Sequence, residues 1–123
     1  MNINFELKAE LLSRGFIVAN ENCHIMEYAM GSIANYTKCT ISLGHRHWGD
    51  IAEQWFYWVR YEAFAESGQP EFDHHTITES YIAESNVVDF LKSKGIYTEA
   101  ERAEHVEQMR RVIRERMEKR LRG

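Results

Sequence analysis

The chain has 123 residues, a formal net charge of −4, and hydrophobic and aromatic contents of 44% and 12%, which predict one globular domain over residues 1–123. No apolar run approaches the roughly 20 residues of a membrane-spanning helix, and the amino terminus lacks the basic-then-apolar order of a secretory signal. We therefore expect no membrane contact and a cytoplasmic location. The two cysteines, Cys23 and Cys39, form no CxxC pair and fit reduced thiols.

The first third of the chain predicts two helices. Residues 6–14 favour a short helix that Gly15 ends, and residues 22–37 place apolar side chains at helical spacing. Residues 39–43 alternate in polarity and are β-prone, but no partner strand is evident for them. Because a lone strand cannot satisfy its backbone hydrogen bonds, we interpret this stretch as a helix end or a connector.

The segment from Trp48 to Phe64 holds seven of the fifteen aromatic residues. Asp50 and Glu53 favour the start of a helix over residues 51–66, which residues 67–70 end. Four consecutive aromatics cannot all face one core, because successive side chains on a helix lie about 100° apart. Either a protein partner covers the second side, or the helix is central and packed on both sides. The candidate interface residues are Trp48, Trp55, Tyr57, Trp58, Tyr61 and Phe64.

The last third of the chain predicts a pair of helices. Thr76 and Glu79 form a capping-box pattern at the start of one helix, and Gly95 supplies a left-handed stop. Thr98 and Glu101 form a second capping box, which opens a helix over residues 98–122 with one apolar stripe. We therefore expect an all-α fold: a single domain of four to five helices with a C-terminal antiparallel helical hairpin.

Basic residues are concentrated at the end of the chain. From residue 110 onward there are seven bases and two acids, a local charge of +5. The candidate basic patch is Arg110, Arg111, Arg114 and Arg120. It could bind nucleic acid, but acids precede the bases in the same segment, which is the order that a helix dipole favours. We favour a solvated helix end over a nucleic-acid contact.

Two Glu-x-x-His pairs suggest a metal site. Glu21 with His24, and Glu71 with His74, have the spacing that places a carboxylate and an imidazole on one helix face, as in di-iron bundles. An iron enzyme built on these four residues is one alternative reading. The second pair directly follows Pro70, in a stretch that favours a loop.

Two further stretches resemble one family. Residues 44–55 (Gly-His-Arg-His-Trp-Gly-Asp-Ile-Ala-Glu-Gln-Trp) and residues 81–101, with a Lys-Gly-Ile-Tyr-Thr-Glu turn, are similar to the helical amino-terminal region of nitrile hydratase β subunits, nitrile hydratase accessory (activator) proteins and thiocyanate hydrolase β subunits. In its penultimate helix the family carries a double aromatic followed by a Trp-Leu, whereas this chain has Tyr81-Ile82 and then Ser85-Asn86.

The resemblance implies a partner protein rather than a catalyst. The cysteine-rich metal loop of the family's catalytic subunit has no counterpart in the sequence. The expected function is a non-catalytic helical subunit or accessory protein of a nitrile-hydratase-like metalloenzyme, with no cofactor of its own. It would act through a protein partner or as a homo-oligomer. The alternatives are the iron enzyme and a phage-type regulatory module that uses the Arg-rich end.

Overall fold

The computed structural model describes residues 3–22, 24–47 and 54–122, and its main feature is a five-stranded antiparallel sheet. The prediction of an all-α fold is therefore wrong. In chain order the elements are α1 (Phe5–Ser13), β1 (Ile17–Val18), β2 (Ile25–Ser32), β3 (Asn35–His47), β4 (Gln54–Ala65), the 3-10 helix η1 (Pro70–Phe72), β5 (His74–Ala83), the 3-10 helix η2 (Glu84–Asn86), α2 (Val87–Ser93) and α3 (Glu99–Arg122).

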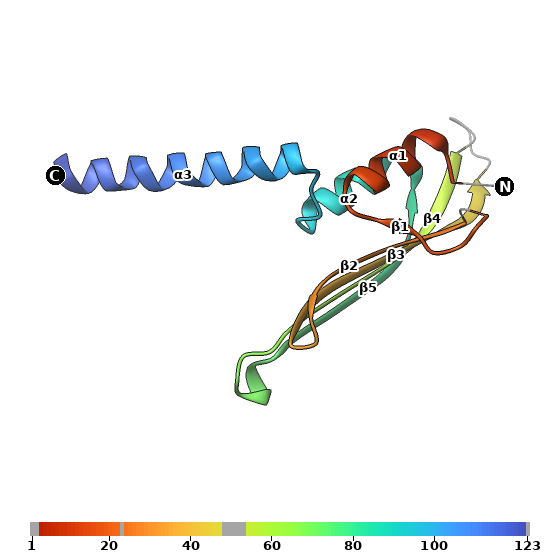
Figure 1. Ribbon diagram of the computed structural model, residues 1–123, viewed down its shortest axis with the longest axis horizontal. Coiled ribbons are helices and arrows are strands. Elements are labelled where there is room, and N and C mark those ends of the chain that lie inside the picture. The colour runs from red at the N-terminus through yellow and green to blue at the C-terminus, as the bar shows by residue number, and fades with distance from the viewer. Residues whose placement is uncertain (1–2, 23, 48–53, 123) are drawn as a thin grey trace.

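The sheet is a simple meander with the order β1-β2-β3-β4-β5 (Figure 1). The central strand β3 pairs with β2 on one side, where Tyr28 lies opposite Cys39, and with β4 on the other, where Cys39 lies opposite Tyr61. Residues 39–43 therefore form the middle of the sheet, and their interpretation as a connector is wrong. Their partner strands had themselves been interpreted as helices.

Three predicted helices are strands. Residues 22–37 contribute to the β2–β3 hairpin, residues 54–65 form β4, and the predicted capping box at Thr76 and Glu79 lies inside β5. β-Branched and aromatic side chains stabilise a sheet by packing across neighbouring strands, and this outweighs local helical spacing. The predicted cap at Asp50 and Glu53 lies outside the described residues.

The first and last helices of the prediction are confirmed. The side chain of Asn4 caps α1 by accepting from the amides of Glu6 and Leu7, and Gly15 follows the helix with a φ of 98°. At the start of α3, the Glu101 amide donates to the Thr98 hydroxyl at 3.2 Å, and the Thr98 amide donates to the Glu101 carboxylate at 3.3 Å. This is the predicted capping box.

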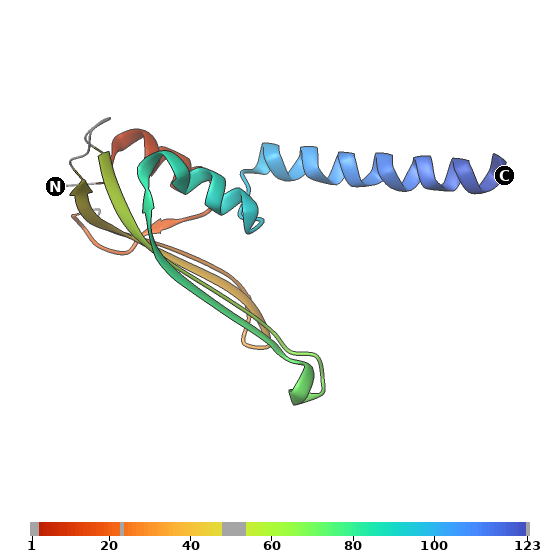
Figure 2. The same ribbon diagram turned by 180° about the vertical axis from the view of Figure 1, so that it is seen from behind.

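Helices α1 and α2 cover one face of the sheet near its base (Figures 1 and 2). Tyr57, Val59 and Tyr61 of β4 point into this core, and Leu11 of α1 and Leu91 of α2 pack against the same cluster. The remaining buried members of the core are Ile3, Leu7, Phe16, Met26, Tyr28, Cys39, Ile41, Val87 and Ile96. The β2–β3 and β4–β5 turns extend beyond the helices.

Helix α3 projects from this body as an arm and contributes no buried residue (Figures 1 and 2). The predicted antiparallel hairpin is therefore wrong: α2 has seven residues and packs on the sheet, whereas α3 runs away from it. The turn at Gly95, with a φ of 76°, redirects the chain between them. Among the helices of the described residues, none has both the length and the apolar character of a membrane span.

Candidate functional site

The predicted aromatic interface residues are divided between the two faces of the sheet. Tyr57 and Tyr61 are buried under the helices, and Trp55 packs partly against the same core. Trp58 and Phe64 alternate with these buried residues and so lie on the opposite face, which none of the described helices covers. The sixth candidate, Trp48, lies outside the described residues. The sequence predicts aromatic side chains on two sides of this segment. They are on two sides because the segment is a strand, in which successive side chains point to opposite faces, and not because it is a helix.

Tyr57 is a structural residue rather than a contact residue. Its side chain is fully buried, and its hydroxyl donates to the Glu84 carboxylate at 2.8 Å and accepts from the Asn4 amide at 3.4 Å. Burial, reinforced by the hydrogen bond to Glu84, raises the pKa of Tyr57 far above its ordinary value of 10. The phenol therefore joins the chain before α1 to η2.

The open face of the sheet carries an aromatic cluster formed by His45, Phe56, Trp58 and Tyr81. The rings of His45 and Phe56 are stacked with centroids 5.5 Å apart, and Tyr81 meets both His45 and Trp58 edge-on at 4.8 and 4.9 Å. Gly44 makes this packing possible: a Cβ there would lie 2.6 Å from the Phe56 carbonyl oxygen and 2.8 Å from the Tyr81 ring. The register shift between Leu43 and His45 lies at the same place.

A polar network lies next to this cluster on the open face. Arg60 forms ion pairs of 2.8 Å with Glu62 and with Glu79, while Glu62 also accepts from the Tyr36 hydroxyl at 2.5 Å and contacts His75 at 3.1 Å. The hydrogen bonds from Tyr36, Arg60 and His75 lower the pKa of Glu62 to about 2. So weakly basic a carboxylate is a poor general base at neutral pH, and its partners are other side chains of the face.

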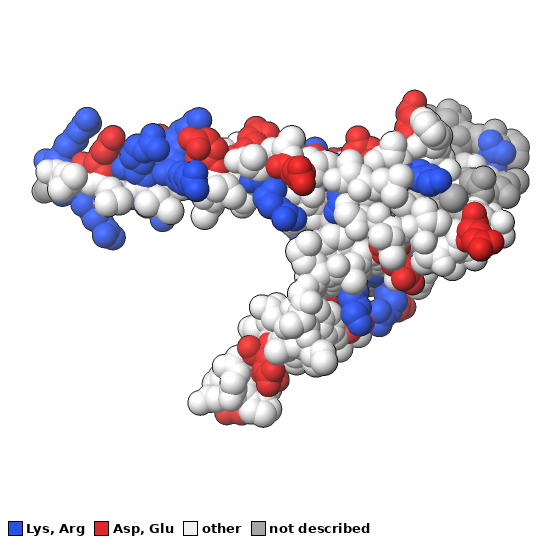
Figure 3. Space-filling view, in the orientation of Figure 1, with Lys and Arg blue, Asp and Glu red and all other residues white. Residues whose placement is uncertain are grey.

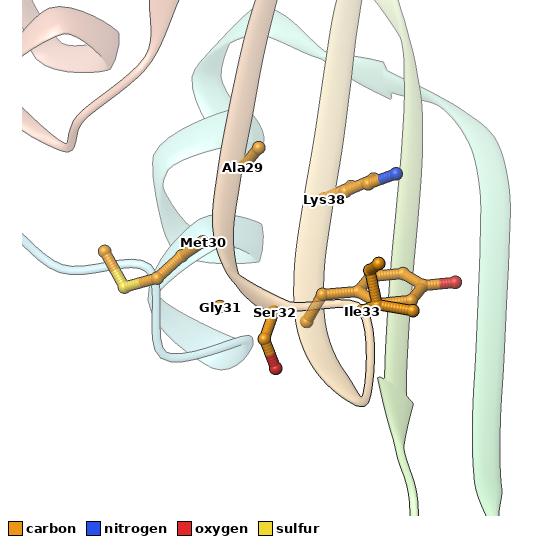
Figure 4. Close-up of a pocket in the computed structure, with 7 residues that line it drawn as sticks. Ala29, Met30, Gly31, Ser32, Ile33 and Lys38 are labelled. Atoms are coloured by element: carbon orange, nitrogen blue, oxygen red, sulfur yellow. The ribbon is translucent and has the colours of Figure 1, made fainter.

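A shallow groove opens beside the β2–β3 turn (Figure 4). Its volume is about 510 Å³, and its lining includes Met30, Ile33 and Lys38. In the close-up, Met30 points away from Ile33 and Lys38, so the side chains diverge around the turn instead of converging on one point. A binding site for a small molecule requires converging polar groups, which this groove does not provide.

The four candidate metal ligands are not brought together. Glu21 and His24 precede β2 at one end of the sheet, whereas Glu71 lies in η1 and His74 begins β5 at the other. His24 adjoins Leu43 of β3, and His74 pairs with Ala65, which is opposite Asn35. Along β3, Leu43 and Asn35 are eight residues apart, a distance of roughly 26 Å, so the two Glu-x-x-His pairs lie near opposite ends of the strand. Over residues 3–22, 24–47 and 54–122, no group of three His, Cys, Asp or Glu side chains could hold a metal ion.

The buried thiol of Cys39 is not a reactive group. Burial raises its pKa to about 12, so almost none of it is thiolate at neutral pH. The side chain lies in the middle of β3, within the hydrophobic core. Cys39 therefore behaves as a small apolar residue. The second cysteine lies outside the described residues.

Helix α3 carries a stripe of exposed apolar side chains. Their exposed fractions range from 41% for Val106 to 86% for Leu121. Spacings of three and four residues place most of them on one side of the helix. The apolar stripe consists of Val106, Met109, Val112, Ile113, Met117 and Leu121. In contrast to α1 and α2, this helix leaves its apolar side uncovered.

The four predicted basic-patch residues all lie exposed on α3. Lys and Arg side chains gather over the outer half of the arm (Figure 3). They surround the helix instead of forming one face: Arg111 and Arg120 are nine residues apart, which places them on opposite sides at about 100° per residue. A contact with one phosphate backbone would use only part of this set.

A buried arginine fixes the base of the arm. The Arg14 side chain, 1% exposed, donates to both carboxylate oxygens of Glu101 at 2.6 and 2.9 Å and to the Ile96 carbonyl at 3.0 Å. Hydrogen bonding from Arg14 is the main reason why the pKa of Glu101 falls to about 2. Glu101 is thus both the capping residue of α3 and the residue that joins the arm to α1.

Sequence reasoning missed the open-face residues Tyr36, His45, Phe56, Arg60, Glu62 and Tyr81 as one surface. The alternating polarity of residues 39–43 could have identified β3 as a strand. Once β3 is a strand, alternation along it and its partner strands assigns each side chain to one face of the sheet. Comparison of the chain with family models, with curated proteins and with solved structures finds no significant match.

Proposed function

We propose that this protein acts by protein–protein contact, and that α3 is its main contact element. The supporting observation is the apolar stripe, which remains exposed along a helix of 24 residues that buries nothing. Full burial of one Val, Leu, Ile or Met side chain is worth about 1.5–3 kcal/mol, so covering this stripe would release a substantial free energy. Exposed apolar patches of this kind are typical of interaction sites.

The stability of helices supports the same proposal. An isolated helix is only marginally stable in water, so most of the stability of a helix in a protein comes from the packing of its apolar side. The capping box and the contact between Arg14 and Glu101 order the first turn of α3. Beyond the contact of the His105 ring with Tyr97, at 5.4 Å between centroids, no described residue of α3 is buried, so a partner chain would supply the missing surface.

The body has a supporting role in this proposal. The core under α1 and α2 makes it a self-sufficient scaffold, and its open face carries Trp58 and Phe64 as additional contact residues. A nitrile-hydratase-like enzyme as the partner is not part of the proposal. Of the stretches that carried that resemblance, residues 44–47 lie in β3, residues 54–55 in β4 and residues 81–83 in β5, where helices were expected, and residues 48–53 lie outside the described residues.

A retention experiment tests the proposal. The 123-residue chain, immobilised through its amino terminus, is exposed to an extract of cells that contain it, beside a stripe variant with Met109→Gln, Ile113→Gln and Met117→Gln. The matched control has Gln108→Ala and Glu115→Ala on the polar side of α3. We expect a defined protein, which can be another copy of this chain, on the wild type and the control but at least tenfold less on the stripe variant. Equal retention on all three would contradict a contact through α3.

A further inference from the structure

We propose that β5 pairs with β5 of a second copy of this chain, so that two five-stranded sheets join edge to edge into one. This contact does not involve α3, and it goes beyond the proposed function. Three features of β5 support it: a long free edge, backbone groups that point away from the sheet, and side chains that match those of a second β5.

The free edge of β5 is long and regular. β5 is the outermost strand of the sheet, and among the described strands it pairs with β4 alone (Figure 1). Its ten residues pair with β4 without a register shift. Edge strands are commonly protected from other chains by short length, lysine, proline or a bulge, and β5 has none of these. Such an edge is suited to the addition of another strand.

The free hydrogen-bonding groups of this edge belong to alternate residues. The Glu66 amide donates to the Ala34 carbonyl at 2.8 Å, and these two residues continue the register in which Asn35 lies opposite Ala65. Hydrogen-bonded pairs alternate along an antiparallel ladder, so the odd-numbered residues of β4 bond to β5, and their partners in β5 are even-numbered. The backbone groups that point away from the sheet therefore belong to His75, Ile77, Glu79, Tyr81 and Ala83.

A two-fold axis at Thr78, perpendicular to the sheet, brings these groups together in two copies. The two β5 strands then run antiparallel, and both copies keep their helices on the same face of the joined sheet. His75 lies opposite Tyr81 of the second copy, and Ile77 lies opposite its Glu79. The opposed residues exchange N–H···O=C bonds, as in any antiparallel ladder. Residues 74–82 of the two copies thus form one continuous ladder.

The rings on the open face favour a second copy over an unrelated strand. Within one chain Tyr81 meets Trp58 at 4.9 Å between ring centroids, and His75 meets Phe64 at 5.8 Å. In the paired strands Tyr81 of each copy faces His75 of the other, at a Cβ separation of roughly 5 Å. The two ring pairs therefore join into one row across the interface, and Tyr81, now 53% exposed, is covered.

The same register suits the charges and the apolar side chains. Glu79 is the one acidic residue of β5, and its carboxylate is bound by Arg60 of its own chain at 2.8 Å. With the axis at Thr78, the two Ile77 side chains, each 49% exposed, become diagonal neighbours. Thr78 lies opposite its own copy, and Thr–Thr pairs are favourable. An axis at Glu79 would instead oppose two carboxylates, which selects the register at Thr78.

Sedimentation equilibrium tests the pairing. The 123-residue chain should have twice the 14.5 kDa mass of one copy, and the stripe variant should keep this mass. Ile77→Lys should raise the dissociation constant at least about tenfold, because a lysine in an edge strand opposes the addition of another strand. The matched control is Met30→Lys in β2, where the side chain is 52% exposed. Far-UV circular dichroism verifies that each variant is folded.

Disulfide cross-linking tests the register. Thr78→Cys and Thr76→Cys are made separately in a Cys23→Ser background. Mild oxidation should cross-link the Thr78→Cys chain to itself, since the Cβ atoms of two opposed residues lie about 4.5–5.5 Å apart. The Thr76→Cys chain should give little product, because the two copies of position 76 are separated along the ladder by roughly 14 Å.

The outcomes separate this inference from the proposed function. A doubled mass that Ile77→Lys alone reduces supports pairing through β5, and so does cross-linking at position 78 but not 76. A mass of one copy at the highest soluble concentration overturns the pairing, as does a dimer that Ile77→Lys leaves intact, and efficient cross-linking at position 76 overturns the register. A dimer that is lost only in the stripe variant overturns this inference and leaves contact through α3 standing. If β5 pairs but retention is equal on the wild type and the stripe variant, only the proposed function fails.

Discussion

The two helices that flank Gly95 use their apolar residues in opposite ways. Helix α2 has seven residues and buries Val87 and Leu91 completely, whereas α3 has 24 residues and buries none. The shorter helix is part of the core, and the longer one is a surface. Length and helical regularity therefore say little about whether a helix holds this body together. The burial of its apolar side decides that.

The largest expected effect contrasts two isoleucines. Ile41 in β3 is fully buried, and Ile113 in α3 is 53% exposed. Ile41→Ala should lower the free energy of unfolding by about 2–5 kcal/mol, because it leaves a cavity in the core. Ile113→Ala should change it by less than about 0.5 kcal/mol at a concentration where the chain is monomeric. Denaturant unfolding followed by tryptophan fluorescence measures both. Comparable losses would mean that α3 packs on the body in solution.

The next effect contrasts two arginines. Arg14→Leu removes the partner of Glu101 and of the Ile96 carbonyl, and it should lower the free energy of unfolding by about 2–4 kcal/mol. The matched change Arg111→Leu, on the exposed arm, should be nearly neutral for the body. Hydrogen exchange should show faster exchange in the first turn of α3 for the Arg14 variant alone. Unchanged protection there would contradict the role of Arg14 as the anchor of the arm.

A third prediction concerns the close contact at Gly44. Gly44→Ala would place a methyl group 2.6 Å from the Phe56 carbonyl oxygen, and it should lower the free energy of unfolding by about 1–3 kcal/mol. Adding Tyr81→Leu relieves the contact with the ring but not the one with the backbone. We therefore expect the double variant to recover little of the loss in denaturant unfolding. Full recovery would mean that the ring alone limits space at this position.

The smallest effect is a dependence on pH. The native pKa of Glu101, about 2, lies below its ordinary value of 4.5, so its carboxylate stabilises the folded state above pH 4.5 and loses this contribution as the pH falls toward 2. Wild type should therefore exceed Glu101→Gln in stability above pH 4.5, and the difference should shrink between these limits. Glu62 titrates in the same range but is present in both proteins. A difference that stays constant with pH would contradict this assignment.

The sequence was informative where local signals and tertiary packing agree. Asn4, Gly15, Thr98 and Glu101 delimit α1 and α3 through contacts within a few residues, and these can be identified from the chain alone. The position of Gly95 after a helix was also predicted correctly, although that helix, α2, is shorter than expected. Caps and stops are local events, so spacing along the chain is sufficient to predict them.

The sheet was missed because both faces of its central strands are rich in large side chains. In β4, buried Tyr57 and Val59 alternate with Phe56 and Trp58 on the open face, so no alternation of polarity is visible. Without that alternation, four adjacent aromatics suggested a helix packed on two sides. The neighbouring stretch of β3 did alternate, but a strand is identified by its partners, and both partners had been interpreted as helices.

The arm as an interaction surface was only partly foreseeable. The stripe on residues 106–121 is evident from spacing, but its exposure depends on what the rest of the fold covers. A predicted hairpin would have buried it against the preceding helix. Once that helix is replaced by β5 and the short α2, no element among the described residues covers the stripe.

Because Arg14 holds the base of α3, a small change there displaces the far end of the helix. The arm it supports has 24 residues and is about 36 Å long. A tilt of about 10° at the pivot would therefore swing the far tip by roughly 6 Å, about the width of one side chain. One guanidinium group inside the body thus governs the aim of a surface far from it, and a substitution there can misalign a distant contact without altering any residue that takes part in it.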